Sequence, residues 1–521
     1  MRIPLFAFLL CSCFFTVHAQ TYFSKVVSGP ELDLLGQTTL TSQGELVTVG
    51  SYKDSLNIYE TNIFVQKMDT TGNMIWTYQY DAGEHDRVYN VIESLDGNLL
   101  IVGYSDSLSG PDKGLLMKVD MNGNLLWNKT YLPALSGINS SRFTHVITTS
   151  DSALLLSGIL NSGSTSSLFF VKTDLNGDVL WSNSTSLSSS AWPVGLVESR
   201  PGEYTVAAQL SASIARSAVV TFDDMGNVLS SLKLEDFWLN LDVRAMVDAG
   251  NGEKILCGEF GISPFLARVD ANDSLLWLYD YSSSGDGFRA IKPLSNGNFV
   301  TYSEYSSLGN KGHSIMEFDG SGNPISYYWV DSDNRFVDRS LFVGPDGSLF
   351  LWAEISYHDG TGQREAVIIR SSVTGQGTCP AQQGNISPTP FGVSQSFNHF
   401  TIYLPPEVNS LTINRTAPQT PTFDLCPPVG IDETDWSGLA LHAFPNPTRG
   451  RIGISINEPI IGENLEVSLY DFQGRRLMRM PIEPGVDDLQ MDLSGYASGV
   501  YWIRFTQNGE LRAVRKVVRE Y

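Results

Sequence analysis

Short apolar runs and turn sequences alternate along most of the chain. Asp96-Gly97 precedes the apolar residues 99–102, and a comparable turn precedes an apolar run seven times, with 45 to 55 residues between successive turns. These turns begin at Gln43, Asp96, Asp151, Pro201, Asn251, Asn296 and Asp346. Asp-Gly and Asn-Gly favour the positive φ angles of two-residue hairpins, and the apolar runs have the length of buried strands. The pattern predicts an all-β repeat.

A second series of turns is interleaved with the first. It reads Asp, two residues, Gly, three residues, Trp, as in the segment from Asp69 to Trp76. The further copies begin at Asp120, Asp174, Asp223, Asp270 and Asp319, with a worn seventh copy at Ser372. Two turns in each unit imply four strands in each unit. Seven such units of about 50 residues predict a seven-bladed β-propeller over residues 20–378, because one blade buries its faces only by stacking on its neighbours.

The tryptophans of this motif recur at the same position of the repeat, which is typical of a residue that stabilises the fold. We expect them to dock between neighbouring blades at Trp76, Trp127, Trp181 and Trp277. The N-terminal segment supplies a further clue, because Phe23 precedes Gln43 by 20 residues, as Trp76 precedes Asp96 by 20. Residues 22–27 are therefore predicted to be the outer strand of the seventh blade, whose own outer strand is lost after Cys379.

The two ends of the chain differ from the repeats. Residues 1–19 contain Arg2, an apolar stretch and Val17-His18-Ala19, which is the pattern of a cleaved signal peptide. No other stretch approaches the roughly 20 apolar residues of a membrane span. Residues 437–521 alternate apolar and polar positions between glycine turns, which predicts a small Ig-like β-sandwich. Residues 379–426 are predicted to be an extension or cap, and residues 427–436 a linker.

The C-terminal motifs resemble the type A sorting domain of the type IX secretion system. The matching residues are Pro445, Asn446, Pro447, Gly450, Leu469, Tyr470, Asp471, Gly474, Gly499 and Tyr501. The resemblance implies export to the outer-membrane surface or the medium in a member of the Bacteroidota. It names the type IX secretion machinery as a partner and implies removal of the domain, with release or lipopolysaccharide attachment of the rest. The Asp-Gly-Trp repeat resembles quinoprotein propeller repeats in outline, which implies a fold and no activity.

Charge and cysteine usage narrow the choice of partner. The net charge is -22, and residues 437–521 contain ten basic and ten acidic residues, which leaves 24 basic against 46 acidic residues upstream. An acidic surface of this kind repels nucleic acid and anionic lipid headgroups. Because secretion leads to an oxidising compartment, we expect a disulfide bond between Cys379 and Cys426, each of which precedes a proline. Cys257 lies in an apolar run and is predicted to be a buried strand thiol.

The sequence contains no local catalytic signature, and we expect no cofactor. Asp120-Met121-Asn122-Gly123 and Asp174-Leu175-Asn176-Gly177 begin like calcium loops but lack the downstream glutamate, so calcium stays an open alternative to a plain hairpin turn. The preferred hypothesis is a non-enzymatic propeller that binds an extracellular glycan or protein. A polysaccharide hydrolase or lyase assembled from several blades is the first alternative, and a structural adhesion component is the second.

Overall fold

The structure is a computed structural model, and it describes most of the chain after the first 22 residues. The described ranges are 23–27, 32–53, 61–83, 85–106, 110–133, 136–187, 190–211, 216–235, 241–261, 263–281, 287–307, 310–332, 335–356, 364–373, 382–383, 389–390, 394–395, 400–403, 406–409, 414–416, 422–424, 441–444, 448–456, 465–470, 476–482, 488–497, 499–508 and 510–519. The predicted signal peptide, the linker and both cysteines of the predicted disulfide lie outside them.

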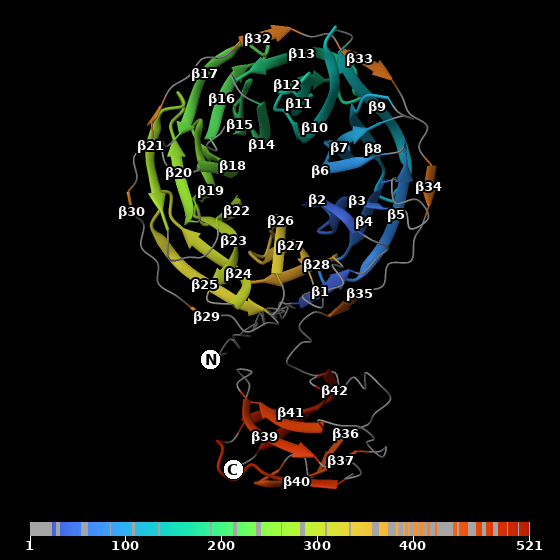
Figure 1. The fold of residues 1–521 in the computed structure, drawn as a ribbon, viewed down its shortest axis with the longest axis vertical. Helices are drawn as coiled ribbons and strands as arrows, with labels where there is room; N and C mark the ends of the chain where they lie inside the picture. Colours follow the sequence, from blue (N-terminus) through green and yellow to red (C-terminus); the bar gives the residue numbers. More distant parts are fainter. Residues whose placement is uncertain are drawn as a thin grey trace, which may run out of the picture.

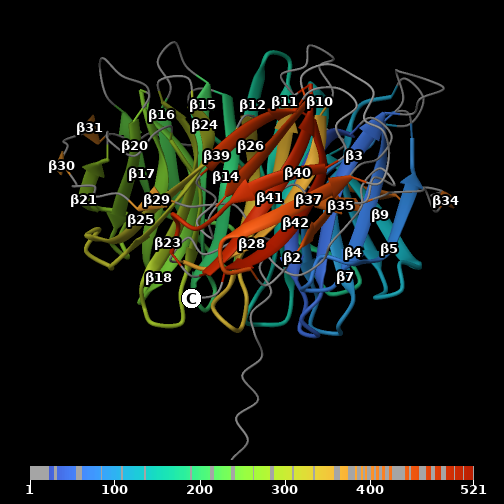
Figure 2. The same ribbon diagram turned by 90° about the horizontal axis from the view of Figure 1, so that it is seen from below.

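The described residues up to 424 form seven antiparallel sheets arranged as the blades of a propeller (Figure 1). The seven innermost strands contact one another in a closed cycle around the axis. Seen from below in Figure 2, the blade strands run between the two faces of the ring. The prediction of a seven-bladed propeller is confirmed.

Each blade is built from four strands of the repeat. The innermost strands of blades 1 to 7 are β2 (Leu32–Leu40), β6 (Arg87–Glu93), β10 (Ile138–Thr148), β14 (Ser190–Arg200), β18 (Leu241–Gly250), β22 (Phe288–Pro293) and β26 (Arg335–Val343). The second strands are β3 (Leu46–Lys53), β7 (Leu99–Ser105), β11 (Leu154–Ser162), β15 (Glu203–Ser211), β19 (Glu253–Phe260), β23 (Phe299–Ser307) and β27 (Leu349–Ser356).

The outer half of each blade follows the same order. The third strands are β4 (Thr61–Met68), β8 (Lys113–Val119), β12 (Thr165–Thr173), β16 (Arg216–Asp223), β20 (Ser263–Val269), β24 (Asn310–Phe318) and β28 (Arg364–Ser371). The fourth strands are β5 (Met74–Asp81), β9 (Leu125–Pro133), β13 (Val179–Ser186), β17 (Val228–Glu235), β21 (Leu275–Asp280), β25 (Pro324–Ser332) and, in blade 7, β1 (Phe23–Val27).

The N-terminal strand closes the ring. Strand β1 pairs with β28 over five residue pairs, from Phe23↔Arg370 to Val27↔Ala366. The last blade is thus completed by the first strand that the structure describes, and this prediction is confirmed. Two further contacts join blade 7 to blade 1, because Thr38 N donates to Ser340 Oγ (3.2 Å) and Arg370 Nη1 donates to the Thr70 carbonyl (2.9 Å).

Each sheet contains the four strands that the repeat predicts and a fifth strand that the sequence analysis did not predict. The fifth strands come from residues 382–424, which pass from blade to blade around the rim of the ring (Figure 1). They are β29 (Gln382–Gln383), β30 (Thr389–Pro390), β31 (Ser394–Gln395), β32 (Phe400–Tyr403), β33 (Pro406–Asn409), β34 (Asn414–Thr416) and β35 (Thr422–Asp424), on blades 6, 5, 4, 3, 2, 1 and 7. We call these seven strands the belt. It pairs with the outer edge of every blade, where an unpaired strand invites aggregation.

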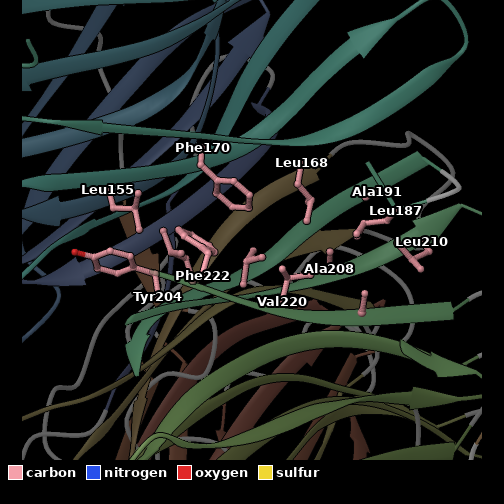
Figure 3. Close-up of a cluster of buried hydrophobic side chains, with 13 residues drawn as sticks. Leu155, Leu168, Phe170, Leu187, Ala191, Tyr204, Ala208, Leu210, Val220 and Phe222 are labelled. Atoms are coloured by element: carbon pink, nitrogen blue, oxygen red, sulfur yellow. The ribbon is translucent and has the colours of Figure 1, made fainter. Parts of the chain in front are cut away.

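Apolar side chains fill the spaces between blades. Figure 3 shows one such cluster, in which Phe170 of blade 3 packs on Phe222 of blade 4 with ring centroids 4.5 Å apart. Cys257 of blade 5 is buried and free, and burial raises the pKa of its thiol to about 12. The predicted strand thiol is confirmed.

The C-terminal residues form two further sheets. One contains β36 (Leu441–Phe444), β37 (Arg451–Ile456) and β40 (Asp488–Asp492), and the other contains β39 (Arg476–Ile482), β38 (Leu465–Tyr470), β41 (Gly499–Gln507) and β42 (Glu510–Arg519). Both sheets contribute buried side chains to one core, among them Ile454, Leu469 and Ile503. A small all-β domain therefore follows the propeller.

Candidate binding site at the centre of the propeller

The tryptophans of the repeat lie at the contacts between blades. Trp76 Nε1 donates to the Met121 carbonyl of the next blade (3.1 Å), and Trp181 Nε1 donates to the Asp224 carbonyl (2.7 Å). Trp127 and Trp277 pack on the turn glycines of the following blades, where a Cβ atom would stand 3.1 Å from either ring. Their contribution to stability stays a prediction.

A tyrosine four residues after the tryptophan makes a second contact, which the sequence analysis missed. Tyr80, Tyr131 and Tyr281 donate their hydroxyls to the turn-glycine carbonyls of the next blade, at 2.7, 2.7 and 2.6 Å. All three tyrosines are fully buried. The spacing Trp-x-x-x-Tyr was the available signal, and tyrosine is a residue whose hydroxyl needs a partner once it is buried.

In blades 2 and 3, a lysine two positions before the turn aspartate joins its strand to the hairpin of the same blade. Lys118 Nζ lies 2.6 Å from Asp96, and Lys172 Nζ lies 2.7 Å from Asp151 while also contacting Asp224 of the next blade. These lysine side chains are only 6% and 2% exposed, so each depends on its carboxylate partners. The repeated Lys-x-Asp could have predicted this contact.

The turn aspartates use their carboxylates within the turn. Asp174 Oδ1 accepts from the backbone N–H groups of Asn176 (2.9 Å) and Asp178 (2.8 Å), and Gly177 has φ 79°. A carboxylate held in this way stabilises a hairpin without a cation. Within the described residues, no group of three or more His, Cys, Asp or Glu is placed to hold a metal ion.

Every innermost strand contains a β-bulge at the same place. At this place, and apart from irregularities nearer the ends of four of the strands, the pairing with the second strand skips Gly36 and Gln37 in blade 1 and one residue in each other blade: Tyr89, Thr144, Val194, Arg244, Arg289 and Arg339. A bulge bends the strand and re-aims the side chain of the extra residue, and bulges are frequent beside functional sites. The sequence pattern did not reveal these residues.

On one side of the axis, the bulge region gathers aromatic side chains. Tyr89 of blade 2 meets Trp192 of blade 4 edge to face, with ring centroids 5.9 Å apart, and lies 6.2 Å from the ring of Tyr104. Arg142 of blade 3 stacks over Tyr104 at 4.4 Å, and its Nε donates to Asp112 Oδ2 (2.7 Å). Burial raises the pKa of Tyr89 to about 12, so its hydroxyl is a neutral donor.

Blades 5 and 6 place charged side chains at the same level. Arg289 Nη1 lies 3.1 Å from Glu259, which also pairs with Arg244, and Arg244 lies 3.5 Å from Asp242. The Nε atom of Arg244 is buried without a hydrogen-bond partner. Burial raises the pKa of Asp242; the positive charge of Arg244 lowers it, and the negative charge of Glu259 raises it further.

The structure describes half of the ten predicted sorting residues. Leu469 is fully buried in the core of the C-terminal domain, Arg504 stacks over the Tyr470 ring at 5.2 Å, and the Gly450 carbonyl accepts from Leu493 N (2.7 Å). Tyr501 is buried and Gly499 begins β41. Pro445, Asn446, Pro447, Asp471 and Gly474 lie outside the described residues.

Comparison with solved structures gives distant matches. A protein of unknown function from Dyadobacter fermentans is 10% identical over 66% of this chain and 97% of its own, with a TM-score of 0.37. A protein from Lactobacillus plantarum is 14% identical over 58% and 94%, with a TM-score of 0.39. Sqt1 from Chaetomium thermophilum is 12% identical over 67% and 97%, with a TM-score of 0.35. We base no argument on these scores, because the strand pairing itself defines the propeller.

Sequence comparison identifies the C-terminal domain. No curated protein matches the chain. Along the described part of the chain, no helix is long and apolar enough to cross a membrane. Residues 442–520 match the family described as the secretion system C-terminal sorting domain, over the seven strands described above. The chain therefore consists of a β-propeller and a type IX sorting domain, which directs its secretion across the outer membrane to the cell surface or the medium.

Proposed function

We propose that this secreted propeller binds an extracellular glycan at its centre, beside the bulges of the innermost strands. One observation carries the proposal. The tryptophans that join the blades recur in four repeats, whereas the bulge positions of blades 2 to 7 vary: they carry Tyr89, Thr144 and Val194 on one side of the ring and the arginines Arg244, Arg289 and Arg339 on the other. A residue that only stabilises the repeat is expected to be the same in every blade. A position that keeps its geometry in every blade but varies its side chain therefore favours a role in ligand binding.

The side chains at this level suit a saccharide. Tyr89 and Trp192 provide rigid aromatic surface with few rotatable bonds, and the buried Tyr104 ring supports Tyr89. Binding sites for small ligands combine such apolar surface with a few oriented polar groups. Arg142 and Arg244 supply donors whose positions are set by Asp112 and Glu259. A saccharide matches both features, because its apolar ring face can stack on the aromatic side chains and its hydroxyl groups can accept hydrogen bonds from the arginines.

The test screens the mature full-length chain on a glycan array. The affinity for each saccharide that binds on the array is then measured by calorimetry. We expect Tyr89→Ala and Trp192→Ala each to weaken binding at least tenfold. Leu180→Ala is the matched control, because Leu180 lies on an outer strand and is 56% exposed. An array without any retained saccharide, or variants that bind like wild type, would disprove the proposal.

A second candidate is a polysaccharide hydrolase, favoured by the carboxylates of Asp242 and Glu259. A carboxyl with a raised pKa beside a second carboxyl group is the arrangement of an acid and its partner in glycoside hydrolysis. Release of reducing ends from polysaccharide by wild type, and its loss in Asp242→Asn, would support this candidate. Binding without any release by either protein would leave recognition as the function.

A further inference from the structure

Lys292 breaks an otherwise uncharged ring around the axis. Three residues after the bulge, the innermost strands carry Thr39, Ile92, Ile147, Val197, Val247, Lys292 and Phe342 in blades 1 to 7. These positions correspond because each pairs with the residue that lies four positions after the first residue of its turn, as Ile92 does with Leu100 and Lys292 with Val300. Ile92, Ile147 and Val197 pack into the clusters between blades, as an aliphatic side chain should. Lys292 is half-buried there and carries a charge.

Lys292 differs from the other lysines of the blade interior in its partners. Lys118, Lys172 and Lys254 each lie within 2.8 Å of an aspartate. Among the described residues, no carboxylate forms an ion pair with Lys292, and its Nζ atom lies over the Phe342 ring, 5.3 Å from the ring centroid. Burial alone lowers the pKa of its ammonium group. A half-buried cation without a counter-ion is costly, and an anion that reaches it removes that cost.

His145 lies within the field of this lysine. His145 is on the innermost strand of blade 3, whereas Lys292 is on that of blade 6. Burial and, to a smaller extent, the charge of Lys292 together lower the pKa of His145 to about 4, against a hydrogen bond with the Val194 backbone that raises it. The imidazole is therefore neutral at pH 7, with Nδ1 2.9 Å from Thr144 Oγ1. It adds a hydrogen-bonding group near Lys292 without adding charge.

We propose that Lys292 binds an acidic group, a carboxylate or a sulfate, on the saccharide that the proposed function assigns to the axis. The inference rests on that function and specifies its substrate class as an acidic glycan. Lys292 lies three strand residues beyond the bulge residue Arg289 of its own blade. At the rise of a β-strand, this separation corresponds to about 10 Å along the strand. A saccharide that stacks at the level of Tyr89 would extend toward Lys292 with its acidic group.

The experiment compares charged and neutralised forms of one saccharide on the mature full-length chain. The probes are an oligogalacturonate, the same oligomer as its methyl ester, and a sulfated galactan oligomer. We expect at least a tenfold preference for one or both acidic probes over the ester, and the two acidic arms distinguish carboxylate from sulfate. Lys292→Met should abolish the preference, and Lys292→Arg should retain it. Lys129→Met is the control, because Lys129 pairs with Asp178 on an outer strand.

A stability measurement separates binding from a structural role. Without ligand, Lys292→Met should melt at a higher temperature than wild type, because it restores an apolar residue at this position. A lower melting temperature together with an unchanged preference would overturn the proposal. Equal binding of ester and acid would also overturn it while leaving the glycan function intact. If an acidic peptide such as polyglutamate is bound and no saccharide is, both proposals fail.

Discussion

The hydroxyl of Tyr131 offers a sharp test of what holds the blades together. Tyr131 is fully buried, and its hydroxyl donates to the Gly177 carbonyl of the next blade at 2.7 Å. Tyr131→Phe removes this bond and leaves the carbonyl without its donor, at a cost of about 1 to 2 kcal/mol. Tyr281→Phe removes the equivalent bond between blades 5 and 6, so the double variant should lose about 2 to 4 kcal/mol by additivity of distant sites.

The assay is urea unfolding of the mature chain, monitored by tryptophan fluorescence. Tyr279→Phe is the matched control, because Tyr279 lies two residues from Tyr281 and stacks on Trp277 with ring centroids 4.9 Å apart, and its hydroxyl makes no hydrogen bond to the described residues. The control should stay within about 0.5 kcal/mol of wild type. If Tyr131→Phe and Tyr281→Phe are as stable as the control, the contact between hydroxyl and turn carbonyl does not stabilise the ring.

Four further outcomes follow from the architecture. Deleting residues 23–27 should broaden the unfolding transition, and an unaltered melting curve would contradict closure by β1. Non-reduced, alkylated protein should show a bond between Cys379 and Cys426, worth about 3 to 4 kcal/mol in the chain-entropy model; free thiols at both positions would exclude it. Burial raises the pKa of Asp86 from 3.8 to about 6, so wild type should gain about 2 to 3 kcal/mol over Asp86→Asn as the pH falls from 7 to 4; a constant difference would refute the assignment. Truncation after Asp435 should leave the propeller in the periplasm, and normal amounts in the medium without lysis would disprove the sorting role.

The repeat could be predicted from the sequence because its signals are local. Asp174 and Gly177 specify a turn through contacts within five residues, and the apolar runs on either side specify buried strands. Seven copies then determine the blade number, since a ring closes only when every blade has two neighbours. The position of Phe23 relative to Gln43 sufficed to place β1, because it copies the spacing of a complete blade.

The belt could not be predicted from the sequence, because its strands are defined by long-range pairing and not by local signals. Gln382–Gln383 and Thr389–Pro390 are two-residue strands without an apolar period of their own, and each is defined only by the outer strand on which it lies. Their pairing joins segments that are far apart in the sequence, such as Gln383↔Tyr328 and Phe423↔Val26. A composition rich in Pro, Ser and Thr indicated an extension and nothing more.

The same distinction between local and long-range contacts applies to the protein as a whole and to its central site. The sequence by itself determined the blades, their turns, the closing strand and the export domain, because each depends on residues close in the chain or on a repeated motif. Only the tertiary structure decided that Tyr89 meets Trp192, that Arg289 meets Glu259, and that the charge of Lys292 lowers the pKa of His145. These pairs come from different blades and share no motif. Closure of the ring brings the innermost strands together, and the bulges direct their side chains. Both depend on the arrangement of several blades, so they cannot be predicted from the sequence of a single repeat.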